Sequence, residues 1–251
     1  YLLTFYSQLE SKEKIILLDV LYEEHGYPAL IQAPITNEWI QTDDNLLTVQ
    51  IPTVDSITGD KLTAYAPNTI GIHFRVEHKD GRVTEKQMEV MKQLFDIGIL
   101  FEKITNLTHF KQSFATTSAK EIAYRTEQNI TQETVLNDII DTSLMIASMG
   151  KFFHANGDFK HIQVGLTGLK SFIYNGAFRI DEAIVASSKA VYLAAIILTD
   201  YKGEIQRWQD GDDIMKYVIK PIEYQFLNKL RNIPGAPLFY WHQTLSLMDK
   251  L

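Results

Sequence analysis

The hydrophobic pattern of the chain changes at Pro52. Leu46–Ile51 is typical of a β-strand, whereas apolar residues recur at helical spacing from Val54 to Tyr65. Pro52 cannot donate a hydrogen bond to a strand ladder, and Ala66-Pro67-Asn68 ends the helical pattern. The stretch Ile51–Ile72 therefore joins a strand-rich first quarter to a helical remainder.

Beyond a hairpin or exposed loop predicted at His78–Gly81, the pattern is helical. We expect Thr84 to cap a long helix that runs to about Ile104. Further helices are predicted over Thr108–Arg125, Gln132–Met149, Asp158–Tyr174, Ile180–Thr199, Asp212–Asn232 and Pro237–Lys250. The predicted class is α+β, with the remnant of a mixed-sheet domain over residues 1–80 and a larger helical bundle over residues 81–251.

The composition excludes several classes of protein. The net charge of −7 argues against a broadly basic surface that holds nucleic acid by its phosphates alone, although a local basic groove stays open. With zero cysteines, the chain can form neither disulfides nor cysteine-based zinc sites. No run of eighteen apolar residues and no signal peptide is present, and we expect a cytoplasmic protein. The start at Tyr1, inside a structured pattern, indicates that the natural chain begins earlier.

Asp19 is an anomaly in the clearest predicted strand, Ile15–Tyr22. Apolar residues alternate on both faces of this segment, which predicts a central strand covered on both sides. An isolated carboxylate buried there costs several kcal/mol unless a metal ion or a basic side chain compensates it. Exposure or hydrogen bonding at the end of the strand is an equal alternative.

Lys61 and Asp96 are the other two candidate site residues. Ile57, Lys61 and Tyr65 share one helical face, so Lys61 borders the buried side; such a lysine either extends to water or presents a compact cation to phosphate oxygens. Asp96 lies in the apolar stretch QLFDIGILF, where it either faces solvent or serves the site. Gly98 in the same helix predicts the close approach of another helix or a ligand.

Other motifs carry little chemistry. Gly165–Ser171 imitates a phosphate-binding loop but lacks the Gly-Lys-Ser/Thr core. The only Asp-x-Asp, at Asp210-Gly211-Asp212, precedes a helical pattern and is interpreted as a helix cap. The seven histidines lack zinc-site spacing.

The segments GDKLTAYAPNTIGI (Gly59–Ile72) and MKQLFDIGILF (Met91–Phe101) resemble the AbiEii/AbiGii-type nucleotidyl transferase toxin family. The resemblance implies a nucleotidyltransferase fold of the polymerase-β-like superfamily, so that residues 1–80 would be its C-terminal part. It implies that Lys61 contacts the nucleotide, that Asp96 is the acid of the Arg-Asp-x-Tyr-Asp helix motif, and that Asp19 is the third acid of the metal site.

Two elements of the family pattern are missing. The arginine of the helix motif is replaced in the stretch Gln93-Leu94-Phe95-Asp96, and Arg75 or Arg82 would have to supply its role. None of the thirteen glycines is followed by Ser, Thr or Gly, so the Gly-Ser…Asp-x-Asp element is absent from these 251 residues. Either it belongs to an upstream segment, or the chain is a degenerate relative.

The resemblance implies a toxin that transfers a nucleotide from a nucleoside triphosphate to an RNA, transfer RNA among them, or to a protein, with Mg²⁺ as cofactor and an antitoxin as partner. We expect the catalytic residues Asp19, Lys61 and Asp96 to converge, with Asp19 on the metal and Lys61 and Asp96 on the nucleotide. RNA binding would require a local basic face of Lys79, Arg82, Lys86 and Lys92. A non-catalytic nucleotide- or protein-binding module and a helical interaction scaffold are the alternatives.

Overall fold

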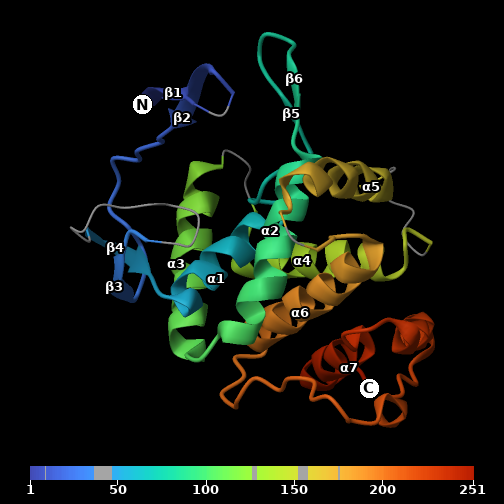
Figure 1. Ribbon diagram of the computed structural model, residues 1–251. Helices are drawn as coiled ribbons and strands as arrows, with labels where there is room; N and C mark the ends of the chain where they lie inside the picture. Colours follow the sequence, from blue (N-terminus) through green and yellow to red (C-terminus); the bar gives the residue numbers. More distant parts are fainter. Residues whose placement is uncertain (9, 37–46, 126–128, 152–157, 175) are drawn as a thin grey trace.

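A computed structural model describes residues 1–8, 10–36, 47–125, 129–151, 158–174 and 176–251. The described chain combines short hairpins with a packed set of helices (Figure 1). This confirms the α+β class.

The described strands form three separate antiparallel pairs. β1 (Leu2–Ser7) pairs with β2 (Lys12–Leu17), β3 (Leu30–Pro34) with β4 (Thr48–Pro52), and β5 (Arg75–Glu77) with β6 (Val83–Glu85). The described residues therefore contain no mixed sheet, contrary to the sequence-based expectation. Leu46, at the start of the second predicted strand, lies outside the described residues.

The prediction of a covered central strand over Ile15–Tyr22 is wrong. β2 ends at Leu17, before Asp19, and pairs only with β1. Ile16 and Leu17 are 54% and 64% exposed. The apolar alternation is real, but the described part of the chain supplies no layer that covers either face.

The helices account for most of the described residues beyond Pro52. Their bounds are α1 Val54–Ala64, α2 Gln87–Leu100, α3 Leu107–Tyr124, α4 Gln132–Ala147, α5 Asp158–Leu169, α6 Ile180–Leu198 and α7 Pro237–Leu247. Short 3₁₀ segments follow α2 (η1, Phe101–Lys103) and α5 (η2, Lys170–Phe172), and two more precede α7 (η3, Ile214–Lys216, and η4, Ile222–Asn232).

Two helix predictions fail for local reasons. Thr84 lies in β6, where its hydroxyl group shares a hydrogen bond with His78 Nε2. Helix α2 therefore begins later, at Gln87. The helix predicted over Asp212–Asn232 is replaced by η3 and η4, separated by Pro221. Proline disfavours helical backbone in the residue before it and lacks an N–H, so a continuous helix cannot pass this point without strain.

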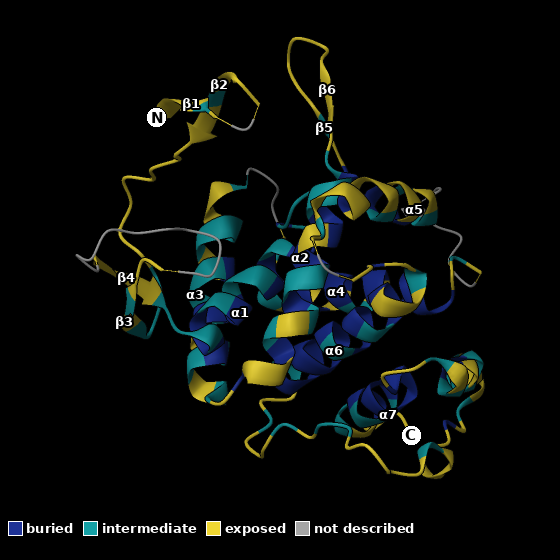
Figure 2. Cartoon of the chain, in the orientation of Figure 1, coloured by how far each residue is buried: buried dark blue, intermediate teal, exposed yellow. Residues whose placement is uncertain are grey.

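The core is a single hydrophobic cluster that runs through the helices. α1 packs on α3, α4 packs on α6, and α2 packs on both α5 and α6. Buried residues line the facing sides of these helices, whereas the first hairpin is exposed (Figure 2). Helix α1, before residue 81, shares the core with α3, after it. The predicted domain boundary at residues 80/81 stays a prediction.

Glycine allows close contacts between helices. A Cβ at Gly59 would lie 2.6 Å from the Phe110 carbonyl oxygen of α3, and one at Gly98 would lie 2.9 Å from the Ala186 Cβ of α6. The close approach predicted at Gly98 is therefore confirmed as helix packing.

None of the helices in the described ranges is both long and apolar enough to cross a membrane.

Candidate functional site

Helix α1 places Lys61 beside α2. Thr53 caps the start of α1 by accepting a hydrogen bond from the Ser56 N–H at 3.3 Å. The helix ends at Ala64, so Lys61 falls in its last turn, where the helix dipole favours a cation. The helix thus fixes the backbone of Lys61, and the helix dipole stabilises its positive charge.

The Lys61 Nζ lies 3.1 Å from the Asp96 Oδ2 in the middle of α2. The two side chains are 23% and 25% exposed, so the pair stands at the edge of the core with access to solvent. Of the three residues expected to converge, Lys61 and Asp96 are in contact. The ion pair joins the two segments on which the resemblance depends.

A second lysine shares the same carboxylate oxygen. Lys92 Nζ, one turn earlier in α2, lies 3.4 Å from Asp96 Oδ2. Two ammonium groups on one carboxylate leave one positive charge in excess at this point. Such a cluster can attract an anion, because lysine carries a compact charge that suits phosphate oxygens.

Asp19 does not join this cluster. It follows β2, is exposed, and within the described residues has no hydrogen bond or ion pair to Lys61 or Asp96. The β1–β2 hairpin projects away from α1 and α2 (Figure 1). Of the two alternatives left open for Asp19, a compensated buried carboxylate and an exposed one, the structure agrees with the exposed one.

A magnesium site does not fit the residues that the structure describes. They contain no group of three or more Asp, Glu, His or Cys side chains that could hold a metal ion. Asp19 therefore belongs to no such group among them. The metal role of Asp19 stays a prediction without a described binding site.

The expected basic face is partly neutralised. Arg82 pairs with Asp80 at 2.7 Å, and Lys92 pairs with Asp96. Neither Arg82 nor Arg75 contacts the Lys61–Asp96 pair in the described structure; Arg75 lies 3.3 Å from Glu77. These arginines therefore do not supply the role of the missing motif arginine there.

A cavity is lined by Asp60, Thr63 and Ala64 of α1, but neither Lys61 nor Asp96 lines it. It has a volume of about 310 Å³. Arg125 borders it and donates to the carbonyl oxygens of Ile70 and, at 3.5 Å, Gly71. Acidic and basic side chains both line it, so its charge selects no single class of ligand; they are Asp60, Lys86, Glu121 and Arg125.

A buried carboxylate in α4 is a polar centre that the sequence pattern did not reveal. Asp138 accepts hydrogen bonds from the Asn68 backbone N–H at 2.8 Å and from the Thr69 hydroxyl at 2.9 Å. Burial raises the pKa of the Asp138 carboxyl above its ordinary value, although these hydrogen bonds oppose the shift. Asp138 fixes the loop that follows α1, and hence the end of α1 that carries Lys61.

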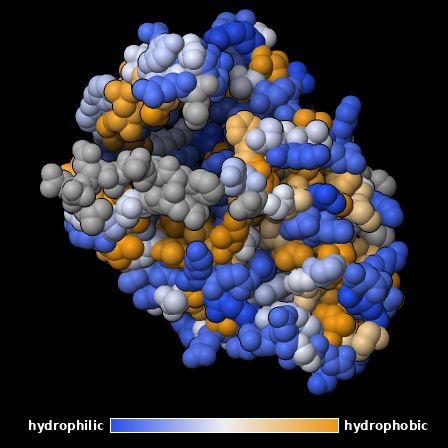
Figure 3. Space-filling model, viewed as in Figure 1, coloured by the Kyte–Doolittle hydropathy of each residue, from blue (hydrophilic) through white to orange (hydrophobic). Residues whose placement is uncertain are grey.

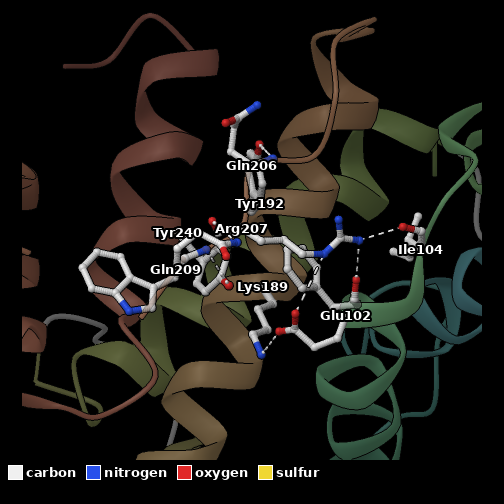
Figure 4. Close-up of polar contacts among 10 residues, drawn as sticks. Glu102, Ile104, Lys189, Tyr192, Gln206, Arg207, Gln209 and Tyr240 are labelled. Carbon is white, nitrogen blue, oxygen red and sulfur yellow. Dashed lines mark hydrogen bonds and ion pairs between the residues drawn. The ribbon is translucent and has the colours of Figure 1, made fainter. Parts of the chain in front are cut away.

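A second missed cluster holds the C-terminal part of the chain. Arg207 donates to the carbonyl oxygens of Phe101 at 3.0 Å and Ile104 at 2.7 Å, at the end of α2 (Figure 4). Its guanidinium carbon also lies 5.5 Å from the Phe101 ring centroid. The carbonyl groups of Phe101, in η1, and of Ile104, directly after η1, thus find a partner far along the chain.

Lys189 of α6 completes this cluster from the other side. Its Nζ lies 2.6 Å from the Glu102 carboxylate and 5.8 Å from the Tyr240 ring centroid (Figure 4). Burial raises the pKa of Tyr240 to about 12. The Lys189 ammonium group thus finds its partners within the protein, which indicates a structural role.

Comparisons with known protein families, with curated proteins and with solved structures found no match to this chain. Family membership is therefore not shown. The ion pair between Lys61 and Asp96 is the observation from which a function is argued below.

Proposed function

We propose that this chain binds a nucleoside triphosphate and acts as part of a nucleotidyltransferase of the AbiEii/AbiGii type. The observation that carries the proposal is the 3.1 Å contact between Lys61 Nζ and Asp96 Oδ2. It pairs the lysine and the acid that the sequence resemblance selects, although they lie on different helices.

In this proposal Lys61 contacts the phosphates. Asp96 holds the Lys61 ammonium at the edge of the core and is itself a positioning residue. The excess positive charge left by Lys92 favours an anionic ligand. Lys92 also directly precedes Gln93-Leu94-Phe95-Asp96, so a cation stands where the helix motif has its arginine.

The proposed activity is transfer of a nucleotide to an RNA, with transfer RNA as the first acceptor to test, or to a protein. The protein would act in the cytoplasm as a toxin restrained by an antitoxin. No metal-dependent step is assigned to the described residues, because they hold no fitting group of ligands. Their proposed contribution is to bind and orient the triphosphate.

A second candidate is a non-catalytic nucleotide- or protein-binding module. It is favoured by the exposed position of Asp19, away from Lys61, and by the lack of a metal-ligand group in the described part of the chain. The transferase and a nucleotide-binding module agree on nucleotide binding by Lys61, whereas a protein-binding module does not require it. They differ on transfer.

The test measures binding and transfer on the same preparations. Binding of ATP, GTP, CTP and UTP is compared for the wild type, Lys61→Ala and the control Lys111→Ala, which removes another partly buried lysine, 3.1 Å from Asp200. Lys61→Ala is expected to weaken binding by about tenfold or more, and Lys111→Ala to stay within about twofold.

Incubation with α-³²P-labelled triphosphates, divalent metal and total transfer RNA then separates the candidates. Label that becomes covalently attached to RNA or protein, and is lost in Lys61→Ala, supports the transferase. Lys61-dependent binding without transfer supports the module. Absence of nucleotide binding, or equal binding by Lys61→Ala, contradicts the transferase and the nucleotide-binding module alike.

A further inference from the structure

Another cavity is formed where α2 packs on α6. Phe95 and Ile99 of α2 line it, together with Val185 and Lys189 of α6. Its volume is about 420 Å³, within the range of about 300–1,000 Å³ that small-molecule sites occupy. Apart from three charged side chains, the described residues that line it are apolar or glycine. The cavity therefore suits the apolar part of a small molecule.

This cavity borders the Lys61–Asp96 ion pair along α2. Asp96 lies between Phe95, which directly precedes it, and Ile99, which follows it by three residues. Side chains three or four residues apart on a helix are neighbours, with Cβ atoms about 5–6 Å apart. Lys92, whose Nζ lies 3.4 Å from Asp96 Oδ2, belongs to the same stretch of helix surface. A ligand held by its phosphates at Lys61 and Lys92 can therefore extend over α2 into the cavity.

Two phenylalanine rings form one wall of the cavity. The Phe95 and Phe178 rings meet edge to face, with centroids 5.3 Å apart and planes at 84°. Phe178 is buried in the core, so the Phe95 ring rests against a fixed partner. An aromatic ring held in this way offers a surface on which a nucleobase can stack, and such stacking tolerates every base because each has a π-face.

Ile99 connects the cavity with the outer surface of α2. Its side chain lines the cavity and is nevertheless 48% exposed. Exposure of an apolar side chain is not distinctive by itself, since hydrophobic residues reach the surface at several places over the helices on the face shown in Figure 3. The distinguishing feature of Ile99 is that it joins this surface to a cavity with an aromatic wall.

The charged side chains of the cavity disfavour an acidic ligand group. Glu182 accepts a hydrogen bond from the Arg179 N–H at 2.8 Å, and the Lys189 ammonium group pairs with Glu102. The Asp181 carboxylate has no hydrogen-bond or ion-pair partner among the described residues, so it is an acceptor open to a ligand. Two carboxylates would repel a carboxylate or phosphate inside the cavity, whereas each nucleobase carries at least one N–H that such an acceptor can bind.

We propose that this cavity receives the base of the nucleoside triphosphate whose phosphates bind at Lys61. The base lies against Phe95 and Ile99, and an N–H on its edge reaches Asp181. The inference rests on the proposed nucleotide binding and assigns the position of the other half of the ligand.

The test compares ATP with inorganic tripolyphosphate, which carries the phosphates without the base. Phe95→Leu removes the aromatic ring, and Ile99→Gln replaces the exposed apolar side chain by a polar one of similar length. Val164→Gln is the matched control, because Val164 of α5 is 49% exposed and does not line the cavity. Lys61→Ala reports on the phosphates. Isothermal titration calorimetry at constant salt measures each affinity on the full chain.

We expect Phe95→Leu and Ile99→Gln each to weaken ATP binding by about fivefold or more, while tripolyphosphate binding stays within about twofold of the wild type. Val164→Gln should leave both ligands within about twofold. Lys61→Ala should weaken both by about tenfold or more, because both carry the phosphates. Circular dichroism and thermal unfolding establish that the variants keep their helical structure. If Phe95→Leu does not fold, the surface variant Ile99→Gln decides alone.

Three outcomes overturn the proposal. ATP binding that depends on Lys61 but is unchanged in Phe95→Leu and Ile99→Gln would place the base elsewhere and leave the proposed function standing. An equal loss of ATP and tripolyphosphate binding in these two variants would show that the cavity residues support the packing of α2 instead of a base. Binding of both ligands that Lys61→Ala does not change would contradict the proposed function itself, and this inference with it.

Discussion

Lys61 Nζ on α1 and Asp96 Oδ2 on α2 lie 3.1 Å apart, on side chains that are 23% and 25% exposed. The ion pair is neither fully buried nor free in solvent. It holds a cation at the surface of the helical core, where an anionic ligand can reach it. A role in binding and a small role in stability both follow from this position.

Loss of the pair should leave the fold intact. Lys61→Ala and Asp96→Ala are each expected to lower the free energy of unfolding by about 1 kcal/mol or less, because solvent screens partly exposed ion pairs. Urea unfolding followed by circular dichroism measures this. A loss of several kcal/mol in Lys61→Ala would mean that its effect on nucleotide binding reports unfolding instead of contact.

Asp138 should matter far more for stability. Asp138→Ala leaves the Asn68 N–H and the Thr69 hydroxyl without the buried acceptor that holds them, so we expect a loss of about 1–3 kcal/mol. Urea unfolding at neutral pH tests this. Asp80→Ala, in an exposed turn, is the control, and a similar loss in both variants would contradict the structural role of Asp138.

The same carboxyl gives a pH dependence of known sign. Burial raises the folded-state pKa of Asp138 above the ordinary value of 3.8, so the folded protein binds the proton more tightly than the unfolded chain. The free energy of unfolding contributed by this group therefore falls as pH rises from 3.8 through the raised folded value. Asp138→Asn should remove that slope, as measured by urea unfolding at a series of pH values; an unchanged slope would contradict the assignment.

The contact between α2 and α6 can be tested by a double-mutant cycle. Gly98→Ala places a Cβ 2.9 Å from the Ala186 Cβ, and we expect a loss of about 1–3 kcal/mol from overpacking. Ala186→Gly should recover part of that loss when the two substitutions are combined. Strictly additive effects in thermal unfolding would show that the helices do not meet at these residues.

The sequence predicts best those helices whose ends are marked by a capping residue or a proline. α1 was expected over Val54–Tyr65 and runs over Val54–Ala64, because Thr53 caps its start and Pro67 lies just beyond its end. The predicted helix over residues 180–199 matches α6, whose apolar composition leaves little alternative. The convergence of Lys61 and Asp96 was also predicted, through the resemblance of two motifs.

The failures concern long-range partners. The apolar alternation around Asp19 indicates that a strand can be covered but not whether a covering layer is present, and the described chain has none. Asp138 looks like any polar residue of a helix, because its partners Asn68 and Thr69 lie about seventy positions earlier. Arg207 was missed for the same reason, since it binds carbonyl groups at Phe101 and Ile104.

The central claim is that Lys61 contacts the phosphates of a nucleotide, and isothermal titration calorimetry with ATP and with adenosine tests it most directly. The wild type, Lys61→Ala and Lys111→Ala are titrated under identical salt. The account predicts that Lys61→Ala weakens ATP binding by about tenfold or more relative to the other two proteins, while adenosine binding, whatever its strength, stays within about twofold in all three. Equal ATP affinity in the wild type and Lys61→Ala would contradict the account.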